Sequence, residues 1–150
     1  MFVKKLSTFC FAGLLCLAAT TSKKHTVWFY INNSSQLSQP VDLSLSIIPK
    51  DEKAIQLTNQ EMQTGLHELP SQKLSEGVYE IRVSTNQNSL NLSQMLTIDS
   101  DRWVIINYEL QDSATIVQTN GFLDTTHYKK VGDQYASMYF YVDNRRPPNL

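Results

Sequence analysis

Residues 74–110 constrain the fold of this chain more than any other stretch. Apolar and polar side chains alternate over residues 78–84 and again over residues 90–98. Successive side chains of a β-strand point to opposite faces, so both runs predict strands with one buried and one wet face. Residues 103–106 are apolar on both faces, which predicts a central strand covered on both sides. Because only short polar joints separate the three runs, we expect an antiparallel three-stranded meander.

Further strand patterns occur on both sides of this stretch. They are residues 26–31, 41–47, 114–119 and 135–142, together with a broken edge strand around Pro70 over residues 65–74. Residues 50–64 suit a short strand or a helical turn. About seven or eight short strands without an amphipathic helix predict an all-β chain folded as an antiparallel β-sandwich.

The first 22 residues have the pattern of a signal peptide. Lys4 and Lys5 precede a continuous apolar run over residues 9–19, and small residues follow it. The apolar run is shorter than the roughly 20 residues that a transmembrane helix needs. We therefore predict a cleaved signal-peptide helix at residues 1–22, a β-sandwich domain at 23–143 and a flexible tail at 144–150, with no membrane span in the mature chain.

Both cysteines, Cys10 and Cys16, lie in the predicted signal peptide. Its removal leaves a mature chain that can form no disulfide and has no cysteine nucleophile. An alternative is lipidation at Cys16, although Leu15 occupies the preceding position, where lipoprotein signals carry a small residue. The expected location is secreted or periplasmic, with a membrane-anchored lipoprotein as the alternative.

Charge and ligand-forming residues argue against several functional classes. The net formal charge is −1, and no like-charged block in the mature part exceeds two residues, so we expect no nucleic-acid binding. His127 with Asp124, or Asp99 with Asp101, could contribute to a metal site, but the three histidines, His25, His67 and His127, form no ligand motif with each other. We predict neither a metal nor a cofactor.

The sequence also contains no recognisable catalytic pattern. It has no Gly-x-Ser-x-Gly nucleophile elbow. A carboxylate pair for glycoside chemistry could be drawn from Glu61, Glu68, Glu80 and Glu109, but each lies at an outward polar position or in an unassigned segment. We predict that the chain has no catalytic residues and is not an enzyme.

Aromatic residues divide into predicted core residues and one candidate interface. Trp28 and Trp103 belong to strands that are apolar on both faces, so we assign both to the core. Alternate residues of 135–142 suit the core, which leaves Tyr135, Tyr139 and Tyr141 together on the opposite face. Tyrosine is enriched at interfaces, so this face is the candidate binding surface. The alternative is that residues 122–133 cover it.

Residues 74–83, Leu-Ser-Glu-Gly-Val-Tyr-Glu-Ile-Arg-Val, resemble a recurrent pattern in bacterial exported sandwiches. The pattern occurs in transthyretin-like, carboxypeptidase-regulatory-like and immunoglobulin-like domains, which often carry proline where this chain has Ser75. The resemblance implies an immunoglobulin-like or transthyretin-like sandwich with a non-catalytic accessory role, and it transfers no functional residue. Tyr79 is expected to be a core tyrosine whose hydroxyl bonds the backbone, as in a tyrosine corner.

Two functional hypotheses follow. The leading one is an exported, non-enzymatic domain that binds an unknown protein or cell-envelope component. The alternative is a periplasmic domain that binds or hydrolyses a glycan or peptide with an aromatic side chain and loop carboxylates. A pocket lined by Trp28 or Trp103 with two carboxylates nearby would favour the alternative.

Overall fold

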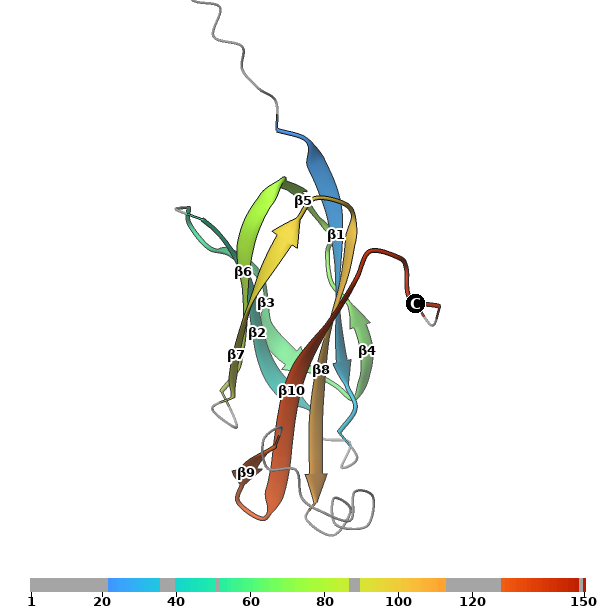
Figure 1. Ribbon diagram of the computed structural model, residues 1–150. Coiled ribbons are helices and arrows are strands. Elements are labelled where there is room, and N and C mark those ends of the chain that lie inside the picture. The colour runs from blue at the N-terminus through green and yellow to red at the C-terminus, as the bar shows by residue number, and fades with distance from the viewer. Residues whose placement is uncertain (1–21, 36–39, 51, 87–89, 113–127, 149) are drawn as a thin grey trace, which may run out of the picture.

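The computed structural model describes residues 22–35, 40–50, 52–86, 90–112, 128–148 and 150. These residues form two β-sheets that face each other, and no helix occurs among them (Figure 1). The described part of the chain is therefore all-β with a sandwich-like fold, as predicted, although it contains ten strands rather than seven or eight. The predicted strand at 114–119, and all of the predicted signal peptide except Ser22, lie outside the described residues.

The strands divide into a six-stranded sheet A and a four-stranded sheet B. Sheet A contains β1 (Lys24–Asn33), β4 (Gly65–Glu68), β5 (Gln72–Ser75), β8 (Arg102–Asp112), β9 (Lys129–Val131) and β10 (Gln134–Asp143). Sheet B contains β2 (Val41–Pro49), β3 (Ile55–Met62), β6 (Gly77–Thr85) and β7 (Asn91–Ile98). The order is β4-β1-β8-β10-β9 in sheet A, with β5 also beside β1, and β3-β2-β6-β7 in sheet B. Every pairing is antiparallel except the parallel pair β1 and β8.

The predicted meander is wrong in its last pairing. β6 and β7 form the expected antiparallel hairpin, but β8 lies in sheet A beside β1. The joint at residues 99–101 therefore carries the chain from one sheet to the other. Packed sheets lie about 10 Å apart, and extended residues span about 3.3 Å each, so a joint of this length permits either a hairpin or a crossing. The sequence pattern of the joint does not distinguish between them.

The broken edge strand predicted for residues 65–74 is confirmed. β4 pairs with the second half of β1, and β5 pairs with its first half. Between them, buried Leu69 donates its backbone N–H to the carbonyl of Phe29 at 2.9 Å, which holds the connection against the sheet. Residues 50–64 provide the edge strand β3 rather than a helical turn.

The core lies between the sheets and is built from the inward side chains of alternating strand positions. In β2 every second residue is buried, as its sequence predicts. Tyr79 of β6 is buried, and its hydroxyl donates a hydrogen bond of 2.8 Å to the carbonyl of Ser75, which confirms the expected tyrosine role. This bond ties the start of β6 in sheet B to β5 in sheet A.

Candidate functional site: the outer face of sheet A

The outer faces of the two sheets differ in chemical character. On sheet B, most outward positions of the central strands are polar: Ser44, Ser46, Glu80, Arg82 and Ser84. On sheet A, nearly half of the corresponding positions of β1, β8 and β10 carry aromatic or aliphatic side chains. An antiparallel sheet in a sandwich commonly has one packed face and one solvated polar face. The outer face of sheet A departs from that expectation.

Strand register arranges these side chains in rows across the face. From β1 through β8 to β10, the rows are Trp28 with Trp103 and Asp143, Tyr30 with Ile105 and Tyr141, and Asn32 with Asn107 and Tyr139. On the other side of β1, β4 adds Glu68 beside Tyr30 and Leu66 beside Asn32. The result is a continuous surface that four strands of sheet A contribute to.

The assignment of Trp28 and Trp103 to the core is wrong. Their rings stack on the outer face with centroids 4.4 Å apart and planes at 10°, and both side chains are partly exposed. The reason lies in the alternation, because Phe29 and Val104 occupy the inward positions next to them. Either side of a strand that is apolar on both faces could face the core. Here the side with the smaller residues, Phe29 and Val104, faces it.

A groove lies next to the stacked indoles on this face. Its volume is about 400 Å³, and it is lined by Asn32, Leu66, Ile105, Asn107, Tyr139, Tyr141, Pro147 and Leu150. We call it the tyrosine groove. Leu66, Tyr139 and Tyr141 remain 48%, 46% and 47% exposed, although all three are large and apolar.

Two of the three predicted interface tyrosines line this groove. Tyr139 and Tyr141 are brought together there, whereas Tyr135 lies farther along β10, opposite Gln111 and Lys130. Sequence reasoning missed Leu66, the Asn32 and Asn107 pair, and the tail residues, because only the sheet pairing brings these segments together. Of residues 122–133, the proposed cover for this face, only 128–133 are described; there β9 pairs with the start of β10 rather than with the part that carries Tyr139 and Tyr141.

Hydrogen bonds orient the polar side chains of the tyrosine groove. Asn32 Nδ2 donates to Asn107 Oδ1 at 3.0 Å. The hydroxyl of Tyr139 donates to Glu109 Oε1 at 3.3 Å, and that of Tyr141 donates to an oxygen of the Asp143 carboxylate at 2.9 Å. Burial and the nearby Glu109 carboxylate raise the pKa of Tyr139, and the bond to Asp143 raises the pKa of Tyr141. Both phenols are therefore neutral at physiological pH.

A second, more open hollow of about 600 Å³ lies beside Trp103. It is lined by Lys23, Lys24, His25, Asp99, Ser100, Asp101, Trp103 and Asn144. We call it the Trp103 hollow. Buried His25 holds its Nε2 3.1 Å from Glu76 Oε1 and its Nδ1 3.8 Å from Asp101 Oδ1. The hydroxyl of Ser100 and, to a lesser extent, the charge of Arg102 lower the pKa of Asp99. This hollow combines an indole with two carboxylates, the arrangement that the glycan hypothesis requires.

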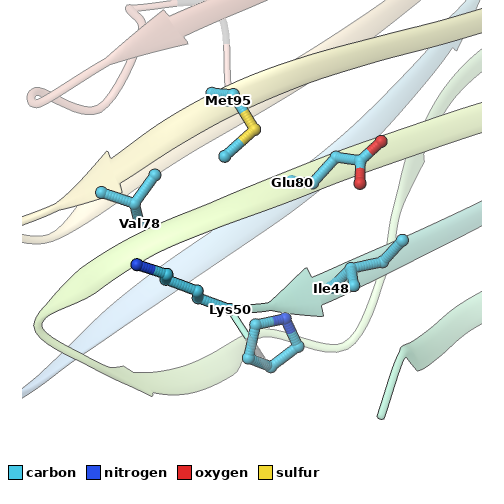
Figure 2. Close-up of a pocket in the computed structure, with 6 residues that line it drawn as sticks. Ile48, Lys50, Val78, Glu80 and Met95 are labelled. Carbon is cyan, nitrogen blue, oxygen red and sulfur yellow. The ribbon is translucent and has the colours of Figure 1, made fainter. Parts of the chain in front are cut away.

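An apolar hollow also occurs on the outer face of sheet B. Its volume is about 250 Å³, and Figure 2 shows Met95, Val78 and Glu80 on one side of it and Ile48 and Lys50 on the other. Met95 is 63% exposed. The Glu80 carboxylate accepts hydrogen bonds from Ser93 and Arg82, which lower its pKa. This hollow is smaller than the tyrosine groove and contains no aromatic residue.

Comparisons with protein-family models, with curated proteins and with solved structures each found no match. Within the described part of the chain, no group of three histidine, cysteine or carboxylate side chains could hold a metal ion. No helix in that part is long and apolar enough to cross a membrane.

Proposed function

We propose that this chain is an exported, non-enzymatic β-sandwich that binds a protein of the cell envelope through the outer face of sheet A. The observation that carries the proposal is the aromatic surface made by the stacked indoles and the tyrosine groove. Large apolar side chains gathered on one exposed face are typical of interaction sites. Tyrosine and tryptophan supply much of the binding energy at such sites, because they contribute large contact areas at low conformational cost.

We also propose that the sandwich is of the transthyretin-like type. The sheet order β3-β2-β6-β7 favours this type over the immunoglobulin-like one, because β2 and β3 pair within one sheet, whereas the second and third strands of an immunoglobulin sandwich lie in opposite sheets. The pattern at residues 74–83 supports it as well, because it covers the step from β5 to β6. Export through a signal peptide predicts a mature N-terminus near Thr20 or Lys23. A mass that instead matches a chain starting at a lipid-modified Cys16 would make the protein a membrane-anchored lipoprotein.

Site-specific photocross-linking tests the binding face. A photoreactive phenylalanine analogue at Tyr141 should form a discrete adduct in the envelope fraction of the native host, whereas the analogue at exposed Arg82, on the outer face of sheet B, should not. Tyr139→Ala should weaken the adduct from position 141 and leave the far-UV circular dichroism spectrum unchanged. Identical adducts from positions 141 and 82, or no adduct from 141, would count against this face as the interface.

The Trp103 hollow favours glycan binding as a second candidate function. An indole offers a flat apolar face to a sugar ring, and carboxylates accept hydrogen bonds from sugar hydroxyls. Soluble peptidoglycan fragments should then produce a saturable change in tryptophan fluorescence that Asp99→Asn abolishes. Asp99 is suited to this test because its side chain is exposed, whereas Asp101 also accepts the backbone N–H of Thr26 at 2.8 Å. A flat titration with every fragment would remove this candidate.

A further inference from the structure

The C-terminal tail lies against the tyrosine groove. Pro147 and Leu150 line the groove together with Tyr139 and Tyr141, and both tail residues are partly buried. In Figure 1 the chain leaves the end of β10 and runs toward the β4 side of sheet A, where the C-terminus is marked. An apolar part of the binding face is thus already in contact with a segment of the same chain.

Two hydrogen bonds set the path of the tail. The backbone N–H of Arg145 donates to Asp143 Oδ1 at 2.9 Å, which turns the chain at the end of β10. The backbone N–H of Leu150 donates to the carbonyl of Pro147 at 3.2 Å, which brings these two apolar residues together at the groove. Pro147 and Leu150 therefore meet at the groove, although the described part of the tail adds no strand to the sheet.

The charges of the tail complement the rim of the groove. Arg145 and Arg146 directly precede Pro147, and the rim of the face carries the carboxylates of Glu68 and Asp143. The charge of Arg145 contributes to the lowered pKa of Asp143. The charge of Arg146 acts on Tyr30, an outward-facing tyrosine that is only 7% exposed and whose hydroxyl bonds Glu68. Arg145 is therefore near the Asp143 carboxylate and Arg146 near Tyr30, while Pro147 and Leu150 line the apolar groove.

We propose that the tail is an intramolecular latch on the protein-binding groove, and that the partner segment which displaces it has the same chemistry. That segment is extended and carries one or two basic residues, then proline, then an aliphatic residue. This inference rests on the proposed function and specifies its partner class and its regulation. Proline-rich segments suit the site because they are already extended when free, and aromatic-lined grooves are the sites that receive them.

Covalent attachment to β10 lets the tail compete effectively with a partner segment for the groove. The tail is joined directly to β10, which forms one wall of the groove, so its effective concentration is on the order of millimolar or higher. A partner segment of comparable intrinsic affinity therefore binds the full chain much more weakly than a chain without the tail. Removal of the tail should raise the apparent affinity by about tenfold or more.

A peptide-binding experiment tests the latch directly. The probe is a fluorescently labelled peptide with the sequence of residues 145–150, Arg-Arg-Pro-Pro-Asn-Leu. It is titrated onto the full chain and onto a variant that ends at Arg145, which keeps the bond to Asp143. Fluorescence polarisation should show saturable binding to the truncated chain and at least about tenfold weaker binding to the full chain. Equal affinity for both chains would overturn the latch.

Matched variants locate the peptide. In the truncated chain, Tyr141→Ala and Leu66→Ser, on opposite walls of the groove, should each weaken binding, while Arg82→Ala on sheet B should leave it unchanged. A peptide with both prolines replaced by alanine should also bind more weakly. Two walls are tested so that a folding defect in one variant, visible by circular dichroism, does not decide the result. Binding that neither wall affects would overturn the assignment of the groove.

Two further outcomes separate the latch from the interface. If the truncated chain binds no peptide but position 141 still cross-links its envelope partner, the proposed function stands and the ligand class is wrong. If the full chain is a dimer by light scattering and the truncated chain is a monomer, the tail docks on a second copy. That result would overturn the intramolecular latch.

Discussion

The stacked tryptophan pair gives a prediction that separates the surface placement from the core placement. A buried tryptophan replaced by alanine costs about 3–5 kcal/mol of unfolding free energy. Here each indole is partly exposed and has its main aromatic partner at 4.4 Å, so each variant loses the stack and only part of its burial. Aromatic pairs contribute about 0.5–1.5 kcal/mol beyond buried area. We therefore expect Trp28→Ala and Trp103→Ala each to lower the free energy of unfolding by about 1–2 kcal/mol.

The double variant tests the stack itself. Each single substitution already removes the ring contact, so the double variant should cost about 1 kcal/mol less than the sum of the singles. Urea unfolding followed by far-UV circular dichroism measures all four proteins on one signal, which tryptophan fluorescence cannot do. The denaturant slope should stay constant. Single losses above about 3 kcal/mol, or costs that add within about 0.3 kcal/mol, would refute the stacked outer-face placement.

Three other predictions concern single hydrogen bonds. Tyr79→Phe should cost about 1 kcal/mol in urea unfolding, because a backbone carbonyl loses its partner, and an unchanged midpoint would contradict that role. The lowered pKa of Glu80 means that its carboxylate stabilises the fold at pH values above the ordinary 4.5, and this stabilisation is lost as the pH falls below 4.5. Ser93→Ala should therefore lower the melting temperature at pH 7 and not at pH 3. The raised pKa of Tyr139 means that its neutral phenol stabilises the fold at pH values below the ordinary 10.0, and this stabilisation is lost as the pH rises above 10.0. In an alkaline absorbance titration, Tyr139→Phe should thus remove one late phenol, and Glu109→Gln should shift Tyr139 and Tyr128 to lower pH. An unaltered curve in both variants would disprove the contact.

Local alternation predicted the strands well, because it reports which face of a strand is buried. The proline at position 70 predicted the broken edge strand, since a residue without an amide donor interrupts a ladder of hydrogen bonds. Alternation did not predict which strands pair, however. The turn at residues 99–101 looks like a hairpin in the sequence, but β8 pairs with β1, a strand more than seventy positions earlier. That choice depends on the packing of both sheets, which no local pattern contains.

The candidate site was predictable only where one strand determines it. Tyr139 and Tyr141 share a face by the two-residue period, and that period alone placed them together. Leu66 and Leu150 reach the same groove through β4 and the tail, so their contribution required the sheet order. The two tryptophans lie on the outer face, although their strands look equally apolar on both sides. A strand that is apolar on both faces does not indicate which side faces the core.

The arrangement of the two sheets supports the proposal that the outer face of sheet A is the binding face. β1 and β8 form a parallel pair at the centre of sheet A, and parallel strands are apolar on both faces when both faces are covered. Sheet B covers their inner face. Among the described residues, the outer face has only partial cover from Pro147 and Leu150, and Leu66, Tyr139 and Tyr141 remain nearly half exposed. We therefore propose that the remaining cover of the aromatic part of this face comes from another molecule.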